Sequence, residues 1–483
     1  MGAPRGGLHK RCYRHSHVGA LVIAAFLAGC AAPTQESTTT ALPVPGQWSV
    51  QDANADAQAA RALSWQDYFS DPGLRQAIAT ALTNNRNLRQ AVLRVEEARA
   101  SYGIQRAASF PNLDLGAQGA RARVPADLSP TGQAAAGNEM RAHVGLNSWE
   151  IDLWGRVRSL NEAALQSYLA SDAARQAVQT ALIAEVADAY LGLLALDERV
   201  ALARATIASH EKSRDIFRRR HEVGAISTLE FTQVETLLVQ ARALGAQLEQ
   251  ARDAQVHALN LLLGNADDIA QGERPKLYDE KFFSTLQVGL PSEVLILRPD
   301  IVAAEHRLRA ARANIAAARA AFFPRIALTG ALGTASTELS NLFQGASRSW
   351  SFMPSITLPI FDGGRLRANL DLAQVRSELA VADYEKAIQN AFREVADALS
   401  ARQWLTERVA IQREAVQTQA RRADLAKLRY DSGAAAYLEV LDAERDLLDA
   451  QQQLVQVRRD LLASHIALYA ALGGGANSPS VQP

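Results

Sequence analysis

The sequence repeats itself: segments of its first half return in its second half at one fixed spacing. E-V-A-D-A at 185–189 returns at 394–398, which is 209 residues later. The same offset relates E-R-V at 198–200 and 407–409, Gly155-Arg156 and Gly364-Arg365, Gly224 and Gly433, and Gly264 and Gly473. A constant offset over about 110 residues is hard to obtain by chance. We therefore expect two copies of one structural unit.

Each copy has the same predicted order: helix, Phe-Pro, strand, loop, strand, Gly-Arg, a very long helix, glycine and another long helix. Pro111 and Pro324 end their helices, because proline lacks the amide donor and disfavours helix in the residue before it. The second very long helix is predicted over 365–430, about 66 residues or roughly 100 Å. The last helix has apolar pairs every seven residues, beginning at Val440-Leu441 and Leu447-Leu448, a pattern that predicts coiled-coil packing.

Strands are predicted at 112–124, 140–154, 325–335 and 350–364, where apolar residues alternate with other residues over stretches near ten residues long. In 140–154 the alternation changes phase, because Val144 and Leu146 have one parity and Trp149, Ile151 and Leu153 the other. That change predicts a β-bulge. The intervening loops are predicted at 125–139 and 336–349.

Strands of this length suit a membrane-crossing sheet, but four strands cannot close a membrane barrel, which needs about eight. An open sheet edge is not tolerated in hydrocarbon. Several chains would therefore have to pool their strands, and two or three copies both satisfy this requirement. The alternative is a small soluble sheet that caps a helical body.

The N-terminus predicts export. Four basic residues, Arg5, Lys10, Arg11 and Arg14, precede a short apolar run that ends in L-A-G-C at Cys30. This box resembles a bacterial lipoprotein signal, which implies acylation of Cys30, and Ala31 after it fits sorting to the outer membrane. The alternative is an ordinary signal peptide with a chance cysteine. The only other cysteine, Cys12, lies in the signal, so no internal disulfide is expected in the mature chain.

The composition and motifs argue against several functions. The 51 basic and 51 acidic residues balance, which gives no support to nucleic-acid binding. The sequence contains no Cys-x-x-Cys, His-Glu-x-x-His, Gly-x-Ser-x-Gly or phosphate-binding loop, so we expect no enzyme and no cofactor beyond lipid on Cys30.

Several segments together resemble the outer-membrane factor family, the TolC-like exit ducts of tripartite efflux pumps, and its lipoprotein branch in particular. They are W-Q-D-Y-F-S-D-P-G-L from Trp65, L-P-S-E-V-L-I-L-R-P-D-I-V-A-A-E from Leu290, F-F-P-R-I-A-L-T-G from Phe322 and I-F-D-G-G-R from Ile360. The resemblance implies an α+β membrane protein: a homotrimer whose twelve-stranded β-barrel, with four strands per chain, continues into a twelve-helix periplasmic α-barrel with a small equatorial region. It also implies a periplasmic adaptor and an inner-membrane resistance-nodulation-division pump as partners.

The predicted divisions of the chain are a signal peptide at 1–29, an acylated tether at 30–64, a first efflux repeat at 65–275, a second at 276–475 and a tail at 476–483. The expected location is the outer membrane, with a lipid anchor and a projection into the periplasm.

The resemblance places a gate near the second glycine turn. Glu439 and Asp442 are three residues apart and share a helix face. In a threefold assembly each would form a ring of carboxylates that selects cations. Asp442 matches an acidic constriction residue of the family, and Glu439 is a conservative departure from it. The alternative is that Glu439 and Asp442 are simply two solvated acids on the surface.

Tyr430 and Glu230 match family positions that bridge neighbouring helices and hold the aperture shut. Related channels add an arginine two residues past the glycine, where this chain has Ala435. The bridge is therefore expected to be weaker or to involve another residue such as Arg429. The candidate adaptor surface is formed by the two turns, namely Val223, Gly224, Ala225, Ser227, Ser432, Gly433, Ala434 and Ala436.

Two other functions remain open at this point. One is a coiled-coil lipoprotein that braces the envelope or acts as a pump adaptor, and the other is an exit duct for type I protein secretion. The sequence does not identify the cargo.

Overall fold

The computed structural model describes residues 58–59, 63–130, 132–264, 277, 282–284, 286–287 and 298–475. All of them belong to one compact unit, which begins at Val44. The signal peptide, Cys30, most of the predicted tether and the tail after Gly475 lie outside the described residues.

Two long helices dominate the fold, α5 (Arg156–Glu222) and α9 (Arg365–Asp431), and each has 67 residues. Their N-caps, Gly155 and Gly364, adopt the left-handed conformation, with φ of 74° and 89°. An aspartate two or three residues before each glycine accepts a hydrogen bond from an amide of the first helical turn: Asp152 from Val157, and Asp362 from Leu366. The predicted helix at 365–430 is confirmed to within one residue.

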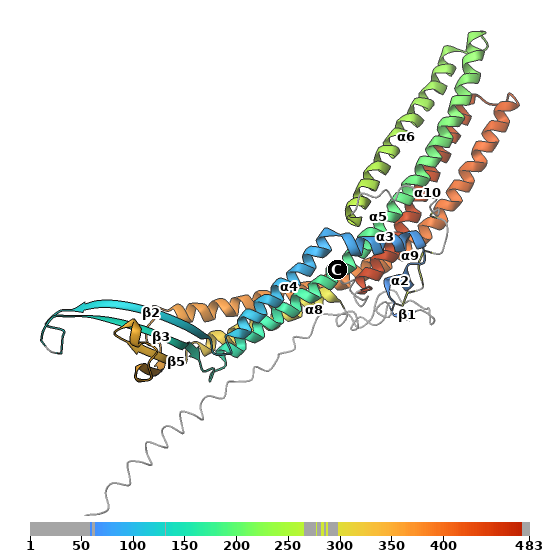
Figure 1. Cartoon of the computed structure of the whole chain (residues 1–483). Coiled ribbons are helices and arrows are strands. Elements are labelled where there is room, and N and C mark those ends of the chain that lie inside the picture. The colour runs from blue at the N-terminus through green and yellow to red at the C-terminus, as the bar shows by residue number, and fades with distance from the viewer. Residues whose placement is uncertain are drawn as a thin grey trace, which may run out of the picture. The chain divides into compact units, whose positions relative to one another are not determined.

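Each long helix turns back into a shorter one, α6 (Thr228–Leu263) after α5 and α10 (Tyr437–Ala471) after α9 (Figure 1). We call α5–α6 the first hairpin and α9–α10 the second hairpin. They pack on one another through α5 and α10. The other halves of α5 and α9 flank α8 (Pro299–Ala320), and α4 (Arg86–Ala107) packs on α5. The heptad residues Val440, Leu441, Leu448 and Val455 are buried, as coiled-coil packing requires.

The four predicted strands form one antiparallel sheet in the order β2-β3-β5-β6. Their bounds are β2 (Leu113–Val124), β3 (Ala135–Glu150), β5 (Arg325–Ser336) and β6 (Arg348–Thr357). The predicted bulge is confirmed, because the register of β3 against β5 shifts between Leu146 and Trp149. Pro354 lies in β6, an edge strand, where the missing amide donor is tolerated.

The predicted bounds of β3 and β6 were wrong. Residues 135–139, expected in a loop, belong to β3 and pair with β2 as far as Ala135 with Val124. These residues are small or polar, and apolar and polar residues do not alternate among them. They form a strand because their backbone pairs with β2. At the other end, β3 and β6 stop at Glu150 and Thr357, earlier than expected. The loop between β5 and β6 contains two short 3₁₀ turns, η1 (Leu339–Asn341) and η2 (Gly345–Ser347).

A compact layer covers the middle of the helical body. It contains α2 (Trp65–Tyr68), α3 (Pro72–Asn84) and the parallel pair β1 (Gln58–Ala59) and β4 (Leu286–Gln287). Tyr68 stacks on Tyr469 of α10 with ring centroids 4.2 Å apart. Tyr68 donates to the His465 carbonyl and Tyr469 to the Leu63 carbonyl. Burial raises the pKa of both phenols, so both stay protonated donors.

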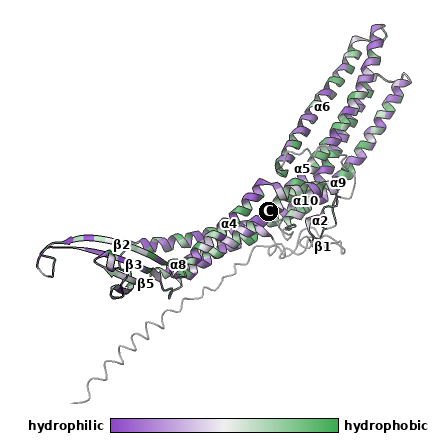
Figure 2. Ribbon diagram, viewed as in Figure 1, coloured by the Kyte–Doolittle hydropathy of each residue, from purple (hydrophilic) through white to green (hydrophobic). Residues whose placement is uncertain are grey.

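Among the residues that the structure describes, one helix, α5, contains an 18-residue segment apolar enough to cross a membrane, but 61% of that segment is buried inside the protein. A buried core helix passes the same test, and Figure 2 shows polar and apolar residues interleaved along α5. Large apolar side chains of the sheet, such as Leu115, Leu332 and Trp350, are exposed.

Candidate functional site

The sheet has one largely apolar face and one face of small and polar residues. Leu115, Val144, Leu332 and Trp350 are successive cross-strand partners, so they form one row across all four strands. Their exposed fractions lie between 48% and 84%. The adjacent row on the other face consists of Asp114, Gly145, Ala331 and Ser351. One lipid-compatible face and one polar face are what a strand of a membrane barrel presents.

The sheet also has two free edges. Among the described strands, β2 pairs only with β3, and β6 only with β5. Each edge offers a row of backbone donors and acceptors that a strand of another chain can complete. The single chain therefore presents a piece of a barrel wall, with one apolar side and two sides ready for pairing.

The two hairpins end in turns of the same design, at 223–227 and 432–436. Gly224 and Gly433 are left-handed, with φ of 74° and 76°. The amide three residues past the end of each long helix donates back to its last turn. Ala225 donates to the Arg220 carbonyl and Ala434 to the Arg429 carbonyl, both at 2.8 Å. The predicted left-handed glycines are confirmed, and these bonds complete the last helical turns.

The turns differ in how the following helix begins. In the first turn, Ser227 caps α6, and Glu230 closes a capping box by accepting from the Ser227 amide at 2.9 Å. In the second turn the equivalent residues, 209 positions on, are Ala436 and Glu439. Alanine has no side-chain oxygen, so α10 has no side-chain cap. Glu439 therefore forms no capping box, in contrast to Glu230.

The two predicted gate acids each contact an arginine of the same hairpin. Arg429 Nη1 donates to Glu439 Oε2 at 2.8 Å, and Arg445 Nη1 lies 3.2 Å from Asp442 Oδ1. The involvement of Arg429 in the bridge, in place of an arginine at Ala435, stays a prediction. Both pairs are exposed, so each contributes little to stability by itself.

The predicted partners Tyr430 and Glu230 are engaged elsewhere within this chain. Tyr430 Oη accepts a hydrogen bond of 2.6 Å from Arg220 Nη1 of α5, and Glu230 stays in its capping box. A bridge between Tyr430 and Glu230 of neighbouring chains stays a prediction. Arg220 was not foreseen, although it is the counterpart of Arg429 in the repeat.

A small aromatic cluster supports the link between the hairpins. Phe217 of α5 is buried against Tyr437 of α10, with centroids 4.2 Å apart, and Tyr430 lies edge-on to Tyr437. Tyr437 Oη donates to Ser213 Oγ of α5 at 3.0 Å. The guanidinium of Arg220 sits 5.7 Å from the Phe217 ring centroid, within range of a cation–π contact. These contacts fasten α9 and α10 to α5 just behind the turns.

The eight predicted adaptor residues are all exposed on the two turns. Val223 is the largest apolar one, with 78% of its surface exposed. No Cβ added at Gly224 or Gly433 would meet another atom within 4 Å, so a partner can approach both glycines closely.

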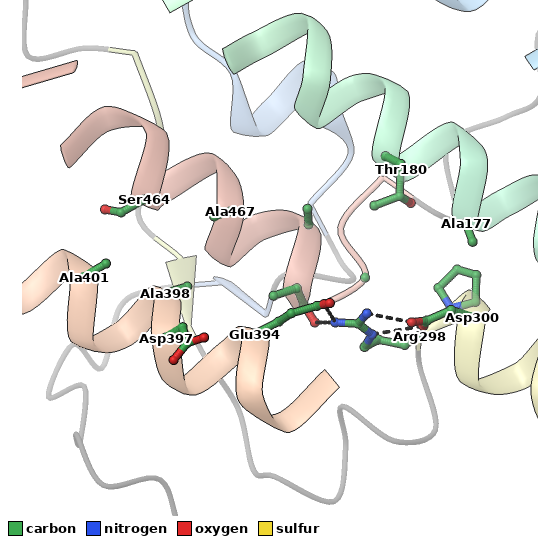
Figure 3. A pocket seen from close by; sticks show the side chains of 15 residues that line it. Ala177, Thr180, Arg298, Asp300, Glu394, Asp397, Ala398, Ala401, Ser464 and Ala467 are labelled. Atoms are coloured by element: carbon green, nitrogen blue, oxygen red, sulfur yellow. Dashed lines mark hydrogen bonds and ion pairs between the residues drawn. The ribbon is translucent and has the colours of Figure 1, made fainter. Parts of the chain in front are cut away.

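Farther from the turns, a pocket of about 590 Å³ lies where α8 begins between α5, α9 and α10 (Figure 3). Arg298, which is 7% exposed, lines this pocket. Its guanidinium donates to both carboxylate oxygens of Asp300 and to the Ala471 carbonyl, and it pairs with Glu394 at 2.7 Å. Arg298 thereby joins the start of α8, the middle of α9 and the end of α10. Among the described residues, no group of three or more His, Cys, Asp or Glu is placed to hold a metal ion.

Known proteins match this chain over nearly all of its length. The profile of the family described as outer membrane efflux protein matches residues 77–265 and 290–474. Outer membrane protein OprJ of Pseudomonas aeruginosa is 45% identical over 465 residues, 95% of each chain. Toluene efflux pump outer membrane protein TtgF of Pseudomonas putida is 44% identical over 479 residues, covering 97% of this chain and 98% of that protein.

Solved structures are similar to this chain as well. A membrane protein from Pseudomonas aeruginosa has a TM-score of 0.86 at 44% identity, covering 91% of this chain and 97% of that one. The open state of the Neisseria gonorrhoeae MtrE outer membrane channel has a TM-score of 0.81 at 37% identity, covering 91% and 98%. These matches confirm the predicted fold class, the predicted outer-membrane location and the predicted role in efflux. The chain belongs to the outer membrane efflux protein family.

Proposed function

We propose that three copies of this chain form the exit duct of a tripartite efflux system and passively conduct what an inner-membrane pump and a periplasmic adaptor hand over. The observation that carries the proposal is the sheet with one apolar face and two unpaired edges. Three copies supply twelve strands and close those edges, which a membrane barrel requires. The hairpins then form the periplasmic part of the duct.

The pump is proposed to be of the resistance-nodulation-division type, and the adaptor to contact the two turns. The cargo is proposed to be small organic molecules, because relatives carry names such as toluene, solvent and antibiotic efflux pump outer membrane protein. We further propose that Cys30 carries the lipid that anchors each mature chain, and that the two efflux repeats divide at residues 275 and 276.

The gate is proposed at the second turn, where Glu439 and Asp442 of three chains surround the axis. Because Arg429 and Arg445 already contact these acids within each chain, the rings at the closed end are paired charges rather than bare carboxylates. Opening would move the second hairpins apart and break contacts such as that between Arg220 and Tyr430.

The test is single-channel conductance of the purified trimer in a planar bilayer, beside the double variant Glu439→Ala, Asp442→Ala. We expect a small wild-type conductance and a larger one in the variant. The variant should also move towards anion preference, since Arg429 and Arg445 lose their partners. Glu235→Ala, an exposed acid on α6, serves as the matched control and should behave like wild type.

Two results would contradict parts of the proposal. Equal conductance and selectivity in wild type and double variant would remove the gate from these residues and leave the duct in place. A monomeric native mass with no conductance from any variant would reject the duct itself and favour an envelope-bracing lipoprotein.

A further inference from the structure

A second pocket, of about 580 Å³, lies between α5, α8 and α9, close to the sheet. Small residues on α8 make room for it. The bounds of α4 and α8 differ by 213 residues at both ends, so α4 is the counterpart of α8 in the repeat. Where α4 carries Ile104 and Gln105, α8 carries Ala317 and Ala318, and both alanines line the pocket. Its volume is in the range of sites that bind small organic molecules.

The charged residues that the structure describes in the lining of this pocket are all arginines, namely Arg156, Arg307, Arg365 and Arg376. Two of them already contact an acid: Arg156 pairs with Glu150 at 2.7 Å, and Arg365 lies 3.8 Å from Asp362. The side chains of Arg307 and Arg376 form no ion pair or hydrogen bond within the described part of the chain. The pocket, which we call the arginine pocket, therefore has an excess of positive charge.

The arginines lie towards the two ends of the pocket. Arg156 and Arg365 are the first residues of α5 and α9, next to the sheet. Arg376 lies 11 residues farther along α9, or about 16 Å away, and Arg307 lies 13 residues before the end of α8, about 20 Å from that end. Leu366 of α9 lines the pocket between them, together with the alanines of α8. The lining thus combines guanidinium groups with an apolar floor.

The sheet end of the arginine pocket adjoins the polar face of the sheet. Glu150 is the cross-strand partner of Ala327, which lies four residues before Ala331 on β5 and so has its side chain on the same face. Glu150 contacts Arg156 at 2.7 Å and Arg325 at 2.9 Å. Arg156 is therefore held at the face that carries the polar residues.

We propose that the arginine pocket binds an anionic amphiphile, an organic molecule with one ionised acidic group and an apolar body. Guanidinium donors form strong hydrogen bonds with sulfonate, carboxylate and phosphate oxygens, and Arg307 and Arg376 have donors to spare. The alanines and Leu366 accept the apolar body.

Two sources supply this chemistry, a transported organic acid and an anionic lipid of the membrane. The position beside the polar face favours the transported acid, because that face lines the duct in the proposed function. This choice of source rests on the proposed function, whereas the binding site itself does not.

Equilibrium dialysis of the purified protein in an uncharged detergent tests the site, with detergent alone as the blank. The probe is naphthalene-2-sulfonate, and naphthalene-2-sulfonamide is its uncharged counterpart. We expect one sulfonate per chain, binding that weakens with added salt, and at least about fivefold weaker binding of the sulfonamide. Because the result is counted per chain, it does not depend on whether three chains form a duct.

Arg307→Gln and Arg376→Gln should each raise the Kd of the sulfonate by about threefold, and the double variant by about tenfold. Neither arginine holds another residue in place, so the fold should survive. Arg312→Gln, at an exposed arginine of α8 outside the pocket, is the matched control and should bind like wild type. Ala318→Leu fills the pocket without changing its charge and should also weaken binding. Equal binding of sulfonate and sulfonamide, or a double variant that binds like the control, would overturn the proposal.

Two further measurements distinguish the sources. Native mass of protein from nanodiscs of phosphatidylglycerol or phosphatidylcholine shows whether an anionic lipid is retained. Retained phosphatidylglycerol that the sulfonate displaces, and that the Arg307→Gln, Arg376→Gln variant loses, assigns the site to lipid. Block of single-channel conductance by the sulfonate, absent in the same variant, assigns it to a transported acid. Sulfonate binding with neither lipid retention nor block would keep the anion site and overturn its place on the wall of the duct.

Discussion

Ser227 and Ala436 occupy the same N-cap position in the two halves of the chain, yet only Ser227 can cap the helix that follows it. The difference is one hydroxyl group, and it changes what the glutamate three residues later does. Glu230 closes the capping box at the first turn, whereas Glu439 turns to Arg429 at the second. The uncapped turn is also the one that carries the proposed gate.

Ala436→Ser should convert the second turn to the design of the first. A new cap stabilises the first turn of α10 by about 1 kcal/mol, and it draws Glu439 away from Arg429. We expect amides of that turn to exchange about fivefold more slowly with deuterium. The reciprocal change, Ser227→Ala, should speed exchange at the start of α6 by a similar factor. Unchanged exchange in both variants would show that the caps do not control these turns.

Tyr430→Phe should weaken the contact between the hairpins, because Arg220 loses its acceptor. The pair is exposed, so we expect a cost of only about 0.5–1 kcal/mol. A double-mutant cycle with Arg220→Gln, read by unfolding in urea, isolates this contact from the aromatic packing that phenylalanine retains. Additive effects of the two single changes would mean that the hydrogen bond contributes nothing.

Arg298→Met should be the most destabilising of the changes considered, because it leaves Asp300, Glu394 and the Ala471 carbonyl without their buried donor. Arg298 is buried, but the side chains of Asp300 and Glu394 are 40% and 42% exposed, so we expect a loss of about 2 kcal/mol, less than for a fully buried ion pair. Arg298→Lys should recover part of that loss, since it keeps the charge but not the two-pronged geometry. Thermal unfolding followed by circular dichroism measures both, and Arg307→Met, at an exposed arginine of α8, should have almost no effect.

Leu332→Arg and Ala331→Arg place the same charge on opposite faces of β5. On the apolar face, arginine near the middle of a bilayer costs about 2–4 kcal/mol, so we expect Leu332→Arg to reduce assembly into the outer membrane. On the polar face, Ala331→Arg should assemble normally and shift the channel towards anions. Equal assembly of the two variants in membrane fractions would contradict the assignment of the faces.

The repeat and the hydrophobic patterns allowed most elements to be predicted, because those signals are local. The left-handed Gly224 and Gly433, the end of α9 and the bulge in β3 all follow from glycine position or residue parity. The start of β3 was missed, since residues 135–139 carry no apolar alternation and pair only because β2 lies beside them.

The contacts of the candidate site were harder to predict than its location. Arg220 and Tyr430 are separated by 210 residues, and neither sequence segment indicates that these two side chains form a hydrogen bond. The loss of the cap at Ala436 was readable from the repeat, since comparison with Ser227 shows it directly. Contacts between chains depend on the assembly and do not follow from the pattern of one chain.

The two free edges of the sheet have a genetic consequence. In the proposed trimer, each chain must pair through β2 with one neighbour and through β6 with the other. A subunit damaged at only one edge would still be recruited through its intact edge, and it would leave the ring open. Mutations confined to β2 or β6 should therefore be dominant over a wild-type copy in the same cell, whereas mutations that abolish folding of the whole chain should be recessive.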